Sequence, residues 1–239
     1  MKIDLIVFSF ILVLIPSIIS YKLKIGIEKE IVKNSIRALI QLTILGFILG
    51  FLFKIKNPLF YLPIIILMLT YSSYIAKKRT NYSFKAAFLT LSLSTFIILI
   101  TLIFLRIISL NPHEFIPISG MIIGNSLNTY TLTIERLKRE ISLQKELIEA
   151  FVALGEKIQN AYKIMQKEAI KAALIPVNNM LQTIGVVAIP GITTGMLLAG
   201  ASPLKAVSYQ IVIIYMLVSI NLFSSLFGSY FYINQLKSS

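Results

Sequence analysis

The sequence contains no cysteine and a single histidine, His113. The absence of cysteine excludes disulfide bonds, zinc–thiolate sites and iron–sulfur clusters, because each needs sulfur ligands from cysteine. One histidine is too few for a His-rich metal site and for most catalysis by an imidazole base. The chain also lacks a G-x-x-x-x-G-K-[ST] loop, which cradles ATP phosphates. We therefore expect no catalytic residue, no metal site and no cofactor in this chain.

Charged residues are scarce and unequal in sign. They make up 14% of the 239 residues, whereas apolar residues make up 56%; a soluble domain has about 25% charge. A helix needs about 20 apolar residues to cross a bilayer, and the sequence contains seven runs that approach this length. They are Ile3–Tyr21, Ala38–Phe53, Pro58–Ala76, Ala86–Ile108, Phe115–Ile134, Ile175–Gly200 and Leu204–Ile233. This pattern predicts an all-α polytopic membrane protein with about seven transmembrane helices.

The first two runs differ from the others in their flanking residues and in their length. The first is followed by Tyr-Lys-Leu-Lys and has no small-residue cleavage pattern, so we expect a retained helix and not a cleaved signal peptide. The second has about 16 residues, which is short for a crossing. We expect it to continue an amphipathic helix that begins near Glu28.

Basic residues predict the orientation. There are 23 lysines and arginines against ten acidic residues, which gives a net charge of +13. If the N-terminus is outside, segments 22–37, 77–85, 135–174 and the C-terminal tail lie inside and carry 18 of the 23 basic residues. The positive-inside rule thus favours an outer N-terminus and a cytoplasmic C-terminus in the cell membrane. The positive charge is typical of cytoplasmic loops beside anionic lipid. A nucleic-acid-binding protein would interleave basic residues with exposed aromatic residues on a soluble face, and this sequence lacks that pattern.

A polar stretch of 40 residues, 135–174, separates the fifth and sixth runs. It contains no proline, and its apolar residues recur at helical spacing. Gly155 lies near its middle, where an isolated glycine costs a helix about 1 kcal/mol relative to alanine. We predict two amphipathic helices that meet near Gly155 and form a cytoplasmic hairpin. This hairpin either packs on the protein's own spans and the membrane, or docks a cytosolic partner, which its charge and length favour.

No acidic residue lies at mid-membrane depth, which argues against a transporter coupled to an ion gradient. The polar residues inside the runs are amides and hydroxyls, many of which we expect to bond between helices. The denser sets on the fifth and sixth runs, with Gln210 on the seventh, are candidates for a substrate pathway. These candidates are Ser119, Asn125, Ser126, Asn128, Asn179, Thr193, Thr194 and Gln210. Pro190 and Gly191 predict a helix break, and Gly195 allows close helix approach.

Two further motifs are more typical of structural residues than of a site. Gly124-Asn125-Ser126-Leu127 lacks the histidine base that an intramembrane serine protease needs, because His113 falls in a predicted external loop. Three methionines in the runs are more typical of core residues than of metal ligands. They are Met121, Met180 and Met196.

Three segments resemble one family. Pro117–Asn128, PISGMIIGNSLN, resembles the P-x-x-G-M-x-x-G-N-S-M-N signature of FetB-type (YbbM-like) permeases, which are membrane subunits of ABC transporters assigned to iron export. Residues 176–211 resemble a second block of that family, and Ser35–Leu42 resembles its R-x-x-x-Q-L stretch. The chain departs from the family pattern at Leu127, at Ile192-Thr193 and at Met196.

The resemblance implies a homodimeric permease in which residues 1–239 form one transmembrane domain. It also implies a cytosolic ABC ATPase subunit that uses ATP and magnesium, and a role in metal (iron) homeostasis. Glu149–Gly155 has the E-A-A-x-x-x-G spacing of the loop that couples such permeases to their ATPases. The implied coupling residues are Glu149, Ala150, Gly155, Lys157 and Tyr162. The alternatives are a secondary transporter driven by an ion gradient, and a membrane scaffold that recruits a cytosolic partner.

Overall fold

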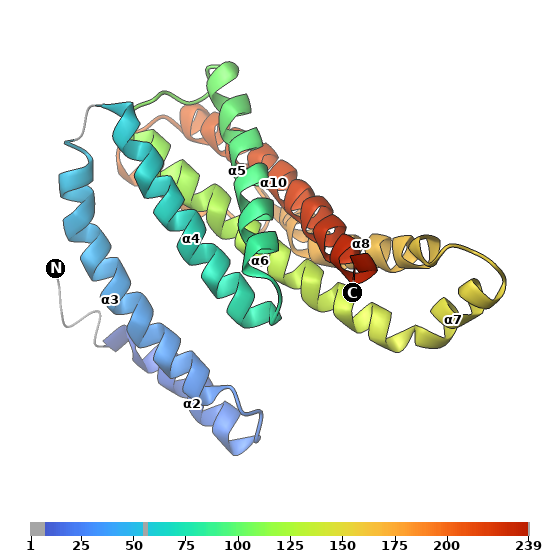
Figure 1. Ribbon diagram of the computed structural model, residues 1–239. Coiled ribbons are helices and arrows are strands. Elements are labelled where there is room, and N and C mark those ends of the chain that lie inside the picture. The colour runs from blue at the N-terminus through green and yellow to red at the C-terminus, as the bar shows by residue number, and fades with distance from the viewer. Residues whose placement is uncertain (1–7, 55–56, 239) are drawn as a thin grey trace. The chain divides into compact units, whose positions relative to one another are not determined.

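The computed structural model describes residues 8–54 and 57–238 (Figure 1). Within those residues all regular structure is helical, apart from an isolated bridge between Ile184 and Ala188, so the all-α prediction is confirmed. The chain divides into two compact units, Met1–Lys56 and Asn57–Ser239. Each unit is described by itself below.

The N-terminal unit is a hairpin of helices α2 (Ile11–Lys22) and α3 (Glu28–Leu52). Gly26 turns the chain at a φ of 85°, a conformation that glycine adopts without steric cost. The Ser20 hydroxyl donates to the Glu28 carboxylate at 3.1 Å and joins the two helices. The predicted continuation of the second run from Glu28 is therefore confirmed, because α3 is one uninterrupted helix. The start of the first run, residues 3–7, lies outside the described residues.

The second unit is built around α6 (Pro112–Leu143), which contacts four other helices. These are α4 (Tyr61–Thr80), which follows the short 3-10 helix η1 (Pro58–Phe60), α5 (Phe84–Phe104), α8 (Ile158–Thr183) and α10 (Pro203–Ser238). Two short helices, α7 (Lys145–Ala153) and α9 (Gly191–Leu198), lie between them along the chain. Figure 1 shows α7 at the far end of the α6–α8 pair.

Four helical segments among the described residues are long and apolar enough to cross a membrane. They are Glu28–Leu52, Pro58–Thr80, Phe84–Phe104 and Pro203–Leu236, and they correspond to the second, third, fourth and seventh runs. A polytopic membrane protein is thus confirmed. The crossings of the other three runs stay predictions: α2 is shorter, and the amides and hydroxyls of α6 lower its hydropathy.

The sixth run, expected as a span with a break at Pro190, is not one helix. Helix α8 ends at Thr183, well before Pro190, and the chain resumes helical structure only at Gly191. The turn begins at Gly185, whose φ is 82°. Pro190 then caps α9 with an extended backbone and has no amide to donate. The predicted break is therefore an irregular segment, 184–190, several residues long.

Helices α6 and α10 approach closely along a face of small and hydroxyl residues. Ser126 and Ser224 share a hydrogen bond of 2.7 Å, and the Thr133 hydroxyl donates to Ser225 at 3.2 Å. Several of these hydroxyls also donate to the carbonyl one turn earlier in their own helix; Ser225, for example, donates to Asn221. In an apolar surrounding, a hydroxyl without a hydrogen-bond partner costs free energy, so these bonds matter. Because serine and threonine side chains are short, they make the bonds while the two helices stay close.

The end of the unit that carries the α4–α5 turn is fixed by polar contacts. The Lys138 ammonium of α6 donates to the Thr80 carbonyl at 2.6 Å, which caps α4. The Tyr82 hydroxyl donates to the Gln235 side chain of α10 at 2.6 Å. Burial, and then the neighbouring Tyr232, raise the pKa of Tyr82 to about 12. Tyr82 therefore stays protonated at physiological pH and keeps this donor.

We expect Gly228→Ala to destabilise the second unit. A methyl group at Gly228 would lie 2.7 Å from the ring of Tyr130, a fully buried side chain. Overpacking of this kind costs about 1–3 kcal/mol. The measurement is thermal unfolding of the detergent-solubilised protein, followed by circular dichroism. Gly124→Ala is the matched control, because no atom lies within 4 Å of its added methyl group. Equal melting temperatures for the two variants would contradict the close approach of α6 and α10.

Candidate functional site

Many of the residues singled out in the sequence fall in two regions of the second unit. One region is the hairpin at the far end of α6 and α8. The other is a pair of clefts beside α10. Helices α6 and α8 run without interruption from the first cleft to the hairpin.

The hairpin ends in α7, a short amphipathic helix. Among the α7 residues only Ile148 is buried, whereas Glu149 and Ala150 are exposed. Leu154, directly after the helix, is 87% exposed. A helix that presents apolar side chains to solvent while one residue anchors it is typical of a surface that another protein covers. Of the other residues predicted to couple to an ATPase, Lys157 caps α8 and Tyr162 is half-buried on α8.

Gly155 closes the turn between α7 and α8. Its φ is 81°, which is strained for residues with a side chain. The Gly155 amide donates to the Val152 carbonyl at 3.0 Å, and the Glu156 amide donates to the Phe151 carbonyl at 3.0 Å. These two bonds form the Schellman motif that ends a helix on a left-handed residue. The meeting of two helices predicted near Gly155 is confirmed.

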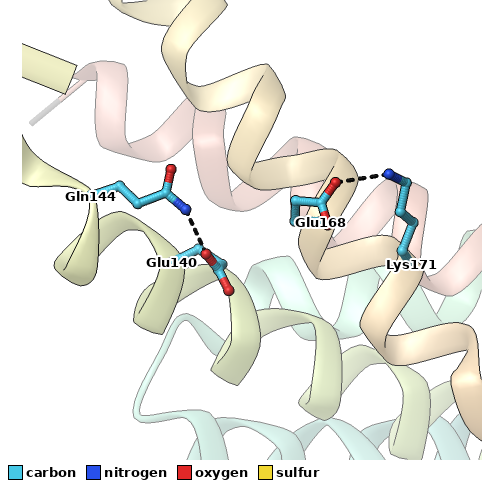
Figure 2. Close-up of polar contacts among 4 residues, drawn as sticks. All are labelled: Glu140, Gln144, Glu168 and Lys171. Carbon is cyan, nitrogen blue, oxygen red and sulfur yellow. Dashed lines mark hydrogen bonds and ion pairs between the residues drawn. The ribbon is translucent and has the colours of Figure 1, made fainter. Parts of the chain in front are cut away.

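A second break, which the sequence did not predict, lies at Gln144 between α6 and α7. Figure 2 shows the Gln144 side chain donating to the Glu140 carboxylate, at 2.7 Å. Glu140 is buried and also pairs with Arg136 at 2.7 Å. The figure shows a separate pair on the neighbouring α8, Glu168 with Lys171; that pair is exposed, and exposed pairs contribute little stability. In the sequence, Glu140 lies four residues from both Arg136 and Gln144, a spacing that brings side chains together on one face of a helix.

Helix α8 packs against α6 and α10, and its buried residues form a stripe of mostly small side chains. The buried members of this stripe recur every four residues: Ala161, Met165, Ala169, Ala173 and Val177. Small side chains let two helix backbones come close over a long distance. Since α6 has 32 residues, it is about 48 Å long at 1.5 Å per residue. Helices α6 and α8 thus form a long, closely packed pair between the hairpin and the first cleft.

The first cleft has a volume of about 210 Å³ and lies between α6, α8 and α10. Its polar wall comes from Asn125, Asn128 and Thr129 of α6 and from Asn221 of α10. The Thr129 hydroxyl donates to the Asn221 side chain at 2.7 Å, and Asn125 donates to the Met121 carbonyl at 2.9 Å. Asn128 is exposed, and no hydrogen bond of its side chain is found among the described residues. The cleft thus offers neutral donors and acceptors in an apolar surrounding.

The second cleft has a volume of about 430 Å³ and lies where segment 184–190 and α9 meet α10. Thr193 and Gln210 share a hydrogen bond of 3.3 Å on its wall. The other lining residues include Ile189, Pro190 and Ile214. Gly191 begins α9, and Gly195 lies inside it.

The remaining predicted pathway residues line neither cleft. Ser119 and Ser126 are fully buried, and each is already paired: Ser119 with the Phe115 carbonyl, and Ser126 with Ser224. Asn179 and Thr194 are exposed on α8 and α9. The structure therefore separates the predicted set into cleft residues, paired residues between helices and outward-facing residues. No group of three His, Asp or Glu side chains that suits a metal ion occurs in the described part of the chain.

Known proteins resemble this chain over nearly its whole length. The family model described as "Uncharacterised protein family (UPF0014)" matches residues 3–236. "UPF0014 membrane protein YjkA" of Bacillus subtilis is 36% identical over 87% of this chain and 84% of its own length. "Probable iron export permease protein FetB" of Escherichia coli is 32% identical over 93% of this chain and 87% of its own length. "Protein ALUMINUM SENSITIVE 3" of Arabidopsis thaliana is 31% identical over 93% of this chain and 82% of its own length.

No solved structure matches the chain significantly. The family match covers both long sequence blocks from which the resemblance was drawn, including the residues of the first cleft and of segment 184–190. On this match and these identities, the chain is a multi-pass membrane protein and a member of the UPF0014 family.

Proposed function

We propose that this chain is the membrane-spanning permease subunit of an ABC exporter, that a separate cytosolic ATPase energises it, and that its cargo belongs to metal (iron) homeostasis. The printed name of the FetB relative supports the permease role and the iron cargo. In this proposal the chain works as a homodimer in the cell membrane. Its N-terminus is outside, its C-terminus is cytoplasmic, and ATP and magnesium bind only the partner.

The observation that carries the proposal is the continuity of α6 and α8 from the first cleft to α7. A partner that covers the apolar residues around Leu154 contacts α7, a helix that is bounded by a break at Gln144 and a turn at Gly155. Movement of that partner during ATP hydrolysis displaces α7 and, with it, the ends of α6 and α8. The opposite portions of those helices carry Asn125 and Met180 on the cleft wall. In this proposal the hairpin transmits the movement of the ATPase to the first cleft.

The chemistry of the first cleft indicates the form of the cargo. Fe²⁺ prefers imidazole and carboxylate ligands, and the lining residues supply only amides, a hydroxyl and apolar groups. Such a surface suits a complexed metal whose own ligands satisfy the ion. We therefore propose that iron passes as a chelate with polar groups that bond to Asn125 and Asn128.

The turn at Gly155 tests the coupling. Valine there is strained, because a β-branched residue strongly disfavours positive φ, whereas asparagine tolerates it. The strain of about 1–3 kcal/mol is relieved by a change of the turn that misplaces α7. We expect Gly155→Val to lose most iron efflux from cells loaded with radioactive iron, and Gly155→Asn to retain it. No atom lies within 4 Å of a Cβ at this position, so neither variant creates a clash. Normal efflux by the valine variant would contradict the coupling role.

The cleft makes a separate prediction. Asn128→Ala removes an exposed amide from the cleft wall without breaking a bond that holds the helices together. We expect iron efflux to fall about tenfold, the effect of losing roughly 1.4 kcal/mol of interaction, while the amount of protein in the membrane stays unchanged. Asn178→Ala is the matched control, because this exposed amide lies on α8 outside the cleft lining. An equal effect of the two substitutions would contradict a pathway through the first cleft.

A further inference from the structure

The two helices of the N-terminal unit leave an apolar groove between them. The groove has a volume of about 660 Å³, and its apolar lining includes Leu14, Ile18 and Tyr21 of α2 with Val32 and Ile36 of α3. Ile18 is 54% exposed and Tyr21 is 73% exposed, so the hairpin itself does not fill the groove. A contiguous apolar surface of this kind is typical of a site that binds another molecule.

Lysines line the part of the groove nearest the turn at Gly26. Lys29 and Lys33 of α3 are four residues apart and therefore lie on one face of the helix. Both are exposed, and neither has an ion pair within residues 8–54 and 57–238. Glu28 also lines this part, where its carboxylate accepts from the Ser20 hydroxyl at 3.1 Å. The lining thus carries two unpaired positive charges and one hydrogen-bonded negative charge.

The charged residues of α3 gather at one end of the helix. Helix α3 is long and apolar enough to cross a membrane, and all its charged residues lie between Glu28 and Arg37, with none from Ala38 to Leu52. A charged side chain in the hydrocarbon core is costly. The first turns of α3 therefore belong at the level of the lipid headgroups, and the groove runs from this level toward the acyl chains.

We propose that the groove between α2 and α3 binds one anionic phospholipid, whose phosphate is held by Lys29 and Lys33. An acyl chain supplies the apolar contacts that Ile18 and Ile36 lack, and the phosphate supplies acceptors for the two ammonium groups. The Tyr21 hydroxyl lies at the same end of the groove and is a further donor. Basic pockets between membrane helices bind acidic headgroups in this way. A zwitterionic lipid brings a cation that the lysines repel, so the site selects its lipid by charge.

A tryptophan reporter tests the occupancy of the groove, since the chain contains no tryptophan of its own. The full-length Ile18→Trp variant is placed in phosphatidylcholine bilayers with a small fraction of phosphatidylglycerol or phosphatidylcholine that carries brominated acyl chains, which quench nearby indole fluorescence. We expect brominated phosphatidylglycerol to bind about tenfold more tightly than brominated phosphatidylcholine. Ile15→Trp is the matched control: this α2 residue is 51% exposed but does not line the groove. We expect no preference there.

Two pairs of charge variants separate a defined site from a diffuse attraction. In the Ile18→Trp chain, Lys29→Gln with Lys33→Gln removes both lysines of the groove, and we expect the preference for phosphatidylglycerol to disappear. Lys22→Gln with Lys24→Gln removes the same charge from the same end of the hairpin, outside the groove lining. We expect this second pair to retain the preference.

Three results would overturn the proposal. Equal preference at Ile18 and Ile15, or equal losses from the two lysine pairs, would show only a general attraction of acidic lipid. Quenching at Ile15 without quenching at Ile18 would show that protein covers the groove. Because tryptophan fills part of the groove, the unsubstituted chain is also measured by native mass spectrometry with added phosphatidylglycerol. We expect one retained lipid that the Lys29→Gln, Lys33→Gln variant loses; a chain that retains none would be the third contrary result.

Discussion

Every backbone amide and carbonyl inside a bilayer needs a partner from the protein, because lipid offers none. This constraint accounts for a chain in which the described regular structure is almost entirely helical. It also accounts for the hydroxyls that donate to carbonyls one turn back, as Thr90 and Ser94 do in α5. Those bonds satisfy many of the hydroxyls that lie between helices, although Ser92, Thr95 and Tyr130 keep buried oxygens without a partner among the described residues. The helices then approach closely, as at Gly228 beside Tyr130.

Within the described residues, some polar groups do not meet this constraint inside one chain. Within residues 8–54 and 57–238, no side-chain partner of Asn128 is found in the first cleft, whose other polar wall residues include the bonded Thr129 and Asn221. In the same part of the chain, segment 184–190 has carbonyls without a donor beside exposed valines. In the proposed transporter the first cleft binds the cargo. The hairpin lies at the other end of α6 and α8, and in the proposed transporter α7 binds the ATPase there.

The sequence could predict those features that depend on composition and on single special residues. Long apolar runs located α5 and α10 to within a few residues, and Gly155 marked the turn because only a residue without a side chain adopts a φ of 81° readily. Pro190 marked the irregular segment for a comparable reason. These signals are local, and local backbone chemistry decides them.

Other features depend on how each helix is rotated about its axis, which composition does not determine. Ser126 and Asn128 are two residues apart, yet one is buried against Ser224 and the other lies at the cleft. The end of α8 at Thr183 depends on bonds to its carbonyl from three later amides, and no residue type specifies these. The burial of Glu140 depends on Arg136 and Gln144 together. Tertiary context decides such cases.

The most direct test of the central claim is an affinity purification of the chain from its native membrane in mild detergent, with identification of bound proteins by mass spectrometry. The account predicts that an ATPase with a G-x-x-x-x-G-K-[ST] loop accompanies the chain in stoichiometric amount. Recovery of the folded chain without such an ATPase in several detergents, together with iron flux driven by an ion gradient alone, would contradict it.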